Sequence, residues 1–306
     1  MSHSRGGSGG GRRNRGQYFG HKNSKILVGD KGREVLENIN ENSLVIKQFR
    51  VYAAELDSKH DRYEAVVKLS RDITIESKRI IFLLHTFDKE SKRDAVLGEA
   101  KTRLDVLAKT LFKSIAQELD GQNPFQYLRA YTAGIQEYIE AVTFYQYLES
   151  NKLDDWKDLE RSLIYVVPCE IKSTPWDGAL EPAAYTSREI RTMLTPHEYI
   201  LGIADLTGEL MRKCISNLGS GDIASCFQTC NFVRSIYIGF LGCVGSSGKE
   251  INRKLYTLKQ SLIKMENVCY TVKVRGSEIP KHMLADVAIG ASNEYAAEDD
   301  EGYHPF

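Results

Sequence analysis

The chain has 306 residues, of which 42% are hydrophobic and 27% are charged, as in an ordinary globular protein. Lys and Arg number 41, as do Asp and Glu, so the formal net charge is zero and no overall basic field attracts nucleic acid. No apolar stretch has the length of a membrane span and no secretory signal is present, so we expect no membrane association.

Both ends of the sequence have low complexity. Residues 1–30 are rich in Gly and Arg, and residues 291–306 are acidic, so neither end can bury enough apolar surface to order. We predict a disordered N-terminal tail, one all-helical domain over residues 31–290, and an acidic C-terminal tail. Within the domain, the Pro-, Thr- and Gly-rich segment 168–190 is predicted to be a loop, either disordered or a lid over a site.

Between the tails, apolar residues recur with helical periodicity almost throughout, and no segment of consequence alternates as a strand does. The 31–123 stretch contains no proline, which favours long helices. Thr195, Pro196 and Glu198 predict a helix start with a capping box. We expect one all-α domain, a bundle of about seven helices with a very long first helix. The expected helices cover 44–85, 90–119, 124–150, 154–165, 195–219, 222–242, 249–273 and 277–290.

Two predicted helices each carry a pair of acids among apolar neighbours. Glu137 and Glu140 lie three residues apart, and Asp205 and Glu209 lie four apart, so each pair shares one helix face. Two unit charges about 4 Å apart repel by roughly 4 kcal/mol at an effective dielectric of 20. Acids that converge on a buried face must therefore share protons, meet basic side chains or hold cations.

The residues leave two of these alternatives open. Four oxygen donors without a thiolate or a suitable histidine favour Mg²⁺, with Mn²⁺ as a substitute, and weigh against a di-iron site. The other interpretation is that the acids pair with Lys or Arg across the bundle or face solvent. Both predict carboxylates on the same helix faces, so spacing alone does not separate them.

Three basic residues lie near these acids in sequence or on the first helix. Lys68 and Arg71 belong to a basic cluster on the long helix, and Arg212 follows the second acid pair within one turn. They are candidates for contacting the phosphate groups of a ligand. The plainer interpretation is that Lys68 and Arg71 form surface salt bridges with nearby acids and that Arg212 complements the helix dipole.

The six cysteines are scattered along the chain, and no CxxC motif occurs. We interpret them as reduced thiols of an intracellular protein, and we expect neither a disulfide framework nor a zinc site.

Several long segments resemble the translin family, and within it the translin-associated factor X (Trax) branch. These segments include ESKR at 76–79, GIQEYIEAV at 134–142, ADLTGELMR at 204–212 and KLYTLKQSL at 254–262, and the likeness extends over most of 45–290. The resemblance implies a seven-helix fold and a closed, shell-like hetero-oligomer with the paralogue translin. It implies catalytic residues at Glu137, Glu140 and Asp205, with Glu209 as a further ligand of the metal that these three hold.

The activity that the resemblance implies is a Mg²⁺-dependent endoribonuclease acting on single-stranded RNA, in which this chain is the catalytic subunit. That enzyme promotes activation of the RNA-induced silencing complex by removing passenger strands, in the cytoplasm and nucleus, and DNA is a further candidate ligand. A basic interior supplied by translin would account for RNA binding by an uncharged subunit. The alternative is a non-enzymatic helical adaptor that binds translin and nucleic acid.

Overall fold

The computed structural model describes residues 39–86, 90–170, 185–243 and 248–276, together with the single positions 278, 280 and 283. The predicted tails at 1–30 and 291–306 lie outside these residues. So do most of the helix predicted for 277–290 and the interior of the predicted loop, 171–184.

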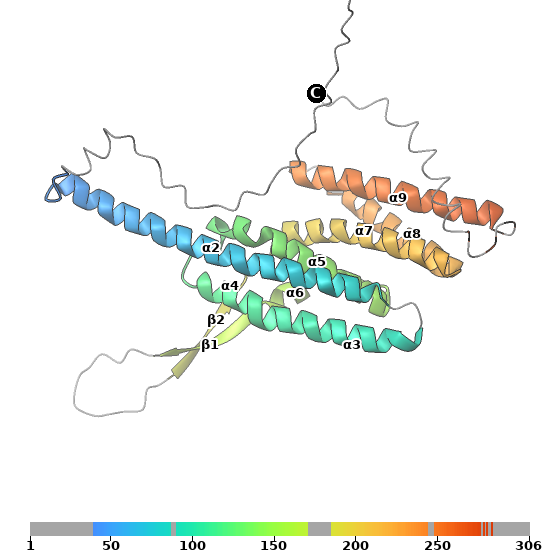
Figure 1. The fold of residues 1–306 in the computed structure, drawn as a ribbon, viewed down its shortest axis with the longest axis horizontal. Helices are drawn as coiled ribbons and strands as arrows, with labels where there is room; N and C mark the ends of the chain where they lie inside the picture. The colour runs from blue at the N-terminus through green and yellow to red at the C-terminus, as the bar shows by residue number, and fades with distance from the viewer. Residues whose placement is uncertain are drawn as a thin grey trace, which may run out of the picture. The chain divides into compact units, whose positions relative to one another are not determined.

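Helices dominate the described residues, and the predicted all-α class with a long first helix is confirmed (Figure 1). The long helices are α2 (Leu44–Leu84), α3 (Glu90–Leu107), α5 (Leu128–Ser150), α7 (Pro196–Gly219), α8 (Ile223–Leu241) and α9 (Lys249–Arg275). Shorter segments are the π-helical turn Ala108–Phe112, α4 (Lys113–Glu118), the 3₁₀ turn Pro124–Gln126 and α6 (Trp156–Ser162).

The chain divides into two compact units, Met1–Asp57 and Ser58–Phe306. The described part of the first unit is a short turn followed by the start of α2, whose large apolar side chains, such as Leu44 and Phe49, are exposed. The second unit contains the rest of α2 and all other described elements, and every site discussed below belongs to it.

Helix α7 lies at the centre of the second unit, where it packs against α5, α8 and α9 (Figure 1). Leu201, Leu206 and Leu210 of α7 are fully buried, as are Ile135 and Ile139 of α5. Burying side chains of this kind contributes about 1.5–3 kcal/mol each, so the apolar stripes on these two helices largely determine their alignment.

Two glycines allow especially close packing of the helices that carry the acids. A Cβ on Gly202 of α7 would lie 2.5 Å from Cγ2 of Ile139, and a Cβ on Gly134 of α5 would lie 2.7 Å from the carbonyl oxygen of Ser70 in α2. Each glycine comes three residues before an acid, Asp205 or Glu137. The separation of the helices that carry Asp205 and Glu137 is thus fixed by direct contact with a glycine backbone.

We expect Gly202→Ala to destabilise the protein by about 1–3 kcal/mol, because the added methyl group overpacks the contact with Ile139. Gly208→Ala on the same helix is the matched control, since its Cβ would meet nothing within 4 Å. That variant should gain up to about 1 kcal/mol from helix propensity. Thermal unfolding of both variants measures the difference, and equal shifts in the same direction would contradict the close α5–α7 contact.

The prediction that no strands occur was wrong, because a two-stranded hairpin follows α6. Strand β1 (Ile164–Glu170) pairs antiparallel with β2 (Tyr185–Arg191), in a register that joins Ile164 to Arg191. The loop expected at 168–190 therefore includes parts of both strands, and α6 ends at Ser162 rather than near 165.

The hairpin is anchored on the π-helical turn between α3 and α4. Tyr165 donates a hydrogen bond to the carbonyl oxygen of Ala108 (2.6 Å), and Thr192, just after β2, donates one to that of Phe112 (2.7 Å). A π-turn interrupts the regular helical hydrogen-bond pattern, which leaves carbonyl groups available to partners outside the helix. The irregular turn thus provides the attachment point for the hairpin.

Candidate functional site

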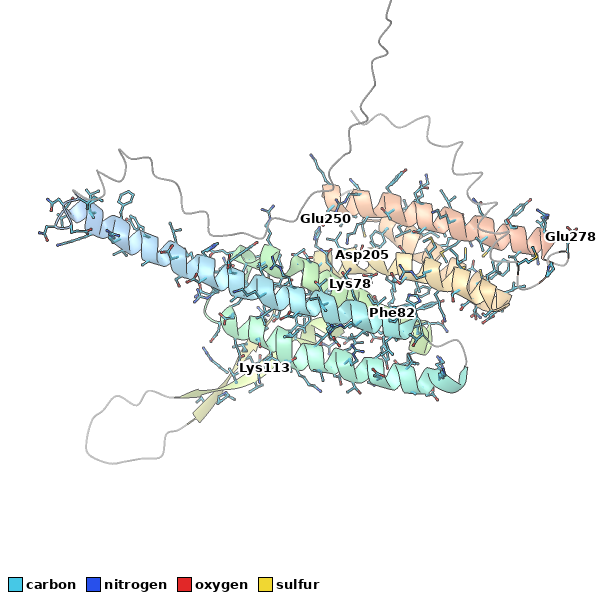
Figure 2. The ribbon with its side chains drawn as sticks, in the orientation of Figure 1. Lys78, Phe82, Lys113, Asp205, Glu250 and Glu278 are labelled. Carbon is cyan, nitrogen blue, oxygen red and sulfur yellow. The ribbon has the colours of Figure 1, made fainter. Side chains whose placement is uncertain are left out.

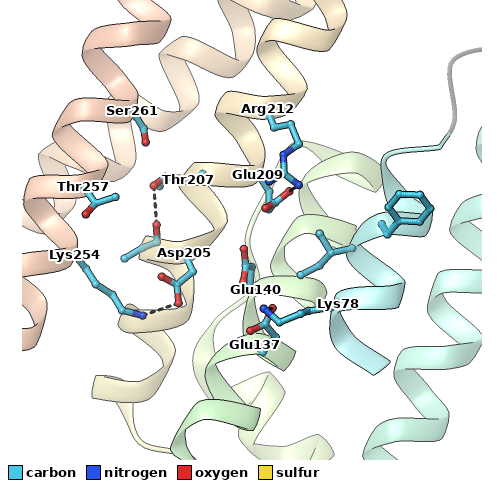
Figure 3. Close-up of a pocket in the computed structure, with 14 residues that line it drawn as sticks. Lys78, Glu137, Glu140, Asp205, Thr207, Glu209, Arg212, Lys254, Thr257 and Ser261 are labelled. Atoms are coloured by element: carbon cyan, nitrogen blue, oxygen red, sulfur yellow. Dashed lines mark hydrogen bonds and ion pairs between the residues drawn. The ribbon is translucent and has the colours of Figure 1, made fainter. Parts of the chain in front are cut away.

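The predicted acids converge on one open cavity of about 560 Å³ within the Ser58–Phe306 unit. Helix α5 contributes Glu137 and Glu140 to its wall, and α7 contributes Asp205 and Glu209 (Figure 3). Helices α2 and α9 complete the lining, and Figure 2 shows Lys78 of α2 and Asp205 of α7 close to each other in the bundle. The two acid pairs, which the sequence places on one face of each helix, therefore face the same cavity.

Two of the acids are paired with bases from α2 and from their own helix. Glu137 lies 3.0 Å from Nζ of Lys78, and the hydrogen bond to Glu137 raises the pKa of Lys78. Glu209 lies 2.6 Å from Nε2 of His85 and 3.0 Å from Nη1 of Arg212. The side chains of Lys78 and Arg212 are 63% and 66% exposed, so both can leave their carboxylates at low cost.

Asp205 belongs to a more rigid network. Lys254 of α9, only 14% exposed, donates hydrogen bonds to Oδ2 of Asp205 (2.6 Å), Oε1 of Gln136 (3.0 Å) and the carbonyl oxygen of Leu201 (3.2 Å). Gln136 in turn donates to the buried carboxylate of Glu198 (2.6 Å). All three ammonium protons of Lys254 are used in hydrogen bonds. Because these bonds reach residues of α5 and α7, Lys254 connects α9 to both of those helices.

Glu140 differs from the other three acids. Figure 3 shows its carboxyl group between Asp205 on one side and Glu137 and Lys78 on the other. No base of the described chain forms an ion pair with it. Burial, followed by the charges of Glu137, Asp205 and Glu209, raises the pKa of Glu140 to about 8, with Lys78 acting in the opposite direction. The site therefore contains one carboxyl group for which it provides no cation of its own.

This donor set fits a hard divalent cation. Four carboxylates face three permanently charged bases, Lys78, Arg212 and Lys254, so the cavity has one excess negative charge when every acid is ionised. Within the described ranges, no three of these carboxylates bring oxygens within 4.8 Å of one another. They line the cavity without closing around a single point, which is compatible with Mg²⁺ because that ion keeps several waters and needs only one or two carboxylates.

The three predicted phosphate-contacting residues have different positions. Arg212 lines the cavity beside Glu209. Lys68 and Arg71 are exposed on α2 and do not line it. Arg71 lies seven residues before Lys78, almost two full helical turns, so the two share a side of α2 about 10 Å apart along its axis.

Three residues that contact the acids were not singled out by the sequence. They are Lys78 of α2, His85 just after that helix, and Lys254 of α9. Lys254 is 49 residues from Asp205 in sequence, so only the packing of α9 against α7 reveals the pair. The predicted capping box forms only in part. The Thr195 hydroxyl accepts a hydrogen bond from the backbone N–H of Glu198, but the Glu198 carboxylate accepts one from the Gln136 side chain instead of returning to the helix start.

Comparison with known proteins identifies the family. The sequence profile of the translin family matches residues 61–276. This chain belongs to the translin family. The match includes α5, α7 and α9 and every acid of the cavity.

Individual relatives match most of the chain. Translin-associated protein X of Pongo abelii is 44% identical over 284 residues, which are 92% of this chain and 93% of that protein. The Mus musculus protein of the same name is 45% identical over 80% of this chain and 84% of its own length. The Schizosaccharomyces pombe homologue is 28% identical over 76% of this chain and 90% of its own.

Solved structures share the fold at low sequence identity. A complex of AfC3PO with duplex RNA superposes with a TM-score of 0.54 at 16% identity, covering 76% of this chain and all of that chain. The apo-NeC3PO crystal structure superposes with a TM-score of 0.52 at 18% identity, covering 74% of this chain and 96% of that one. No helix among the described residues is both long and apolar enough to cross a membrane.

Proposed function

We propose that this chain is the catalytic subunit of a hetero-oligomer with translin and that the assembly is a Mg²⁺-dependent endoribonuclease for single-stranded RNA. Two of the comparisons support it: close relatives are named for their association with translin, and one solved relative contains duplex RNA. The cellular role proposed for it is passenger-strand removal during activation of the RNA-induced silencing complex, in the cytoplasm and nucleus.

The observation that carries the proposal is the environment of Glu140. Its carboxyl group lies among three other acids without a base of its own, and its pKa is raised to about 8. A purely structural network would gain from an amide or an apolar group at this position, because a buried carboxyl group costs free energy when it ionises. A divalent cation removes that cost, since it favours the ionised form.

Glu137, Glu140, Asp205 and Glu209 would hold the cation, with Mn²⁺ as a substitute for Mg²⁺. Bound there, Mg²⁺ would supply charge stabilisation at the scissile phosphate and a lowered pKa for the attacking water. Lys254 orients Asp205 through its three hydrogen bonds, and His85 orients Glu209. Such hydrogen bonds fix the direction in which carboxylate oxygens point.

The rim of the cavity suits a nucleic-acid strand. Lys78 and Arg212 are exposed and can exchange their carboxylate partners for phosphate oxygens. Phe82 also lines the cavity and is 73% exposed, which offers a flat face for stacking an unpaired base. Lys68 and Arg71 would follow the backbone farther along α2. Stacking requires unpaired bases, so these features favour single-stranded RNA.

One observation favours the alternative, a non-enzymatic adaptor for translin. Three of the four acids are already paired with basic side chains, and a set of such pairs can exist for packing alone. In that case Glu140 would remain protonated at neutral pH and no cation would bind.

Metal dependence separates the two functions. The chain is co-expressed with translin, freed of divalent ions with a chelator, and incubated with end-labelled single-stranded RNA. We expect cleavage to fall by about 100-fold or more without metal and to return on addition of Mg²⁺ or Mn²⁺. RNA retention on a filter, measured in parallel, should persist, because exposed Lys and Arg side chains supply much of the binding. An assembly that binds RNA but never cleaves it with either ion would establish the adaptor.

A further inference from the structure

Four cysteines from three helices meet in the core of the bundle. They are Cys214 of α7, Cys226 and Cys230 of α8, and Cys269 of α9, and none is more than 6% exposed. The sulfur of Cys226 lies 2.8 Å from that of Cys214 and 3.8 Å from that of Cys269. Cys230 lies one helical turn from Cys226 on α8 and interacts electrostatically with Cys269. Cys214, Cys226 and Cys269 therefore form one compact cluster of thiols, with Cys230 one helical turn away.

The distances suit a single metal ion. The sulfurs of Cys214, Cys226 and Cys269 all lie within 4.8 Å of one another. With a Zn–S bond of about 2.3 Å, two sulfurs on one ion can be at most about 4.6 Å apart, and a tetrahedral site separates them by about 3.8 Å. The Cys226–Cys269 separation already has this value, and the Cys214–Cys226 pair needs to open by about 1 Å.

The alternative states of the cluster fit less well. A disulfide requires two sulfurs about 2.05 Å apart, and all five cysteines whose side chains the structure describes are free thiols. Without a metal, the thiols would be held only by weak S–H···S hydrogen bonds such as the 2.8 Å contact between Cys214 and Cys226. The sulfurs of Cys214, Cys226 and Cys269 surround one common centre, and Cys230 is the next cysteine along α8.

We propose that Cys214, Cys226 and Cys269 bind a structural Zn²⁺ ion, with Cys230 as the fourth ligand. Soft thiolates in tetrahedral arrangement select Zn²⁺ over Mg²⁺ or Ca²⁺, and a cluster of several iron atoms would need wider sulfur spacing. This site is chemically distinct from the carboxylate cavity, which contains oxygen donors. It also revises the expectation that the cysteines are simple reduced thiols with no zinc site.

Binding releases four thiol protons to solvent, so the ion and four thiolates carry two net negative charges. Arg234 of α8 interacts electrostatically with Cys230 and Cys269, and it also pairs with Glu266 at 2.9 Å. Its guanidinium therefore offsets part of the buried charge. The zinc would join α7, α8 and α9 to one another. Cys214 comes five residues after Glu209, so the ion would also hold the part of α7 that follows the acids.

The test is the metal content of the purified full-length chain, co-expressed with translin and washed free of loosely bound ions. Elemental mass spectrometry should find about one Zn²⁺ per chain. An organomercurial that attacks thiols should release it, which separates thiolate-held zinc from zinc held by carboxylates. Replacement by Co²⁺ should produce the strong visible absorption and the thiolate charge-transfer band of a tetrahedral thiolate site.

Variants assign the ligands. Cys226→Ser and Cys269→Ser should reduce bound zinc by about tenfold or more, whereas Cys243→Ser, outside the cluster, should keep it. Because a cluster variant could fail to fold, the wild-type zinc content and Co²⁺ spectrum are decisive by themselves. A reduced wild-type chain that contains no zinc and binds neither Zn²⁺ nor Co²⁺ overturns the proposal. A Cys214–Cys226 disulfide found by peptide mapping of the native protein also overturns it.

Discussion

Replacing Glu140 by Gln should reduce RNA cleavage by about 100-fold or more while the assembly with translin forms normally. Loss of a residue that only orients a metal ligand costs about 10–100-fold, so loss of a direct ligand should cost at least as much. Gln has nearly the same shape as Glu and needs no counter-charge, so the packing of α5 against α7 is preserved. Cleavage of labelled RNA at saturating Mg²⁺, together with gel filtration of the complex, measures both effects.

Glu149→Gln is the matched control, because Glu149 lies on the same helix, is exposed and is not part of the cavity. It should cleave RNA as the wild type does. Glu137→Ala and Asp205→Ala should also abolish cleavage, although Asp205→Ala leaves the Lys254 ammonium without its carboxylate partner and should lower stability as well. Normal rates in both of these variants and in Glu140→Gln would show that the acids have been wrongly assigned.

Without divalent ions, the stability of the wild-type protein should fall as pH rises from about 4.5 to 8, and Glu140→Gln should remove this fall. The pKa of Glu140 is near 4.5 in the unfolded chain and about 8 in the folded one. Between these values the folded state binds more protons, so unfolding becomes easier as pH increases. The slope is at most about 1.4 kcal/mol per pH unit, and a loss on the order of 2–4 kcal/mol by pH 9 is expected.

Melting temperatures of the wild type, Glu140→Gln and Glu149→Gln, measured from pH 5 to pH 9 in chelator, provide the comparison. The Glu140→Gln variant should become the most stable of the three at alkaline pH. Added Mg²⁺ should then raise the melting temperature of the wild type and leave that variant nearly unchanged, because a ligand stabilises only the state that binds it. Parallel curves for all three proteins would show that Glu140 titrates as an ordinary exposed carboxyl group.

Helical periodicity was sufficient to predict most of the fold. The start of α7 followed from Thr195 and Pro196, and the 41 residues of α2 followed from an apolar stripe without proline. The hairpin was missed because β2, YTSREIR, has few apolar residues and its partner lies across a long intervening segment. Strand pairing depends on the partner and on the anchor at the π-turn, and neither is visible in the local sequence.

The sequence predicted the part of the site that depends only on which residues share a helix face. Acids three or four residues apart must share a face, and the buried sides of α5 and α7 do meet in the folded chain. Arg212, a base on α7 itself, was predicted, but Lys78 and Lys254 come from α2 and α9, where nothing in the local pattern marks them. The cysteine cluster was missed for the same reason, since its members are 12 and 43 residues apart and only the packing of three helices unites them.

The contact of Gly202 with Ile139 sets the distance between the two acid-bearing helices, α7 and α5, and the contact of Gly134 with Ser70 sets the distance between α5 and α2. Glycine has no side chain that could rearrange at these contacts, so we expect the helix separations to persist when the carboxylates are exchanged. A protein engineer could therefore convert the carboxylates to imidazoles or amides one at a time and compare ion preferences on an unchanged scaffold. By the same logic, natural variation at these two glycines would alter the spacing of all four ligands together.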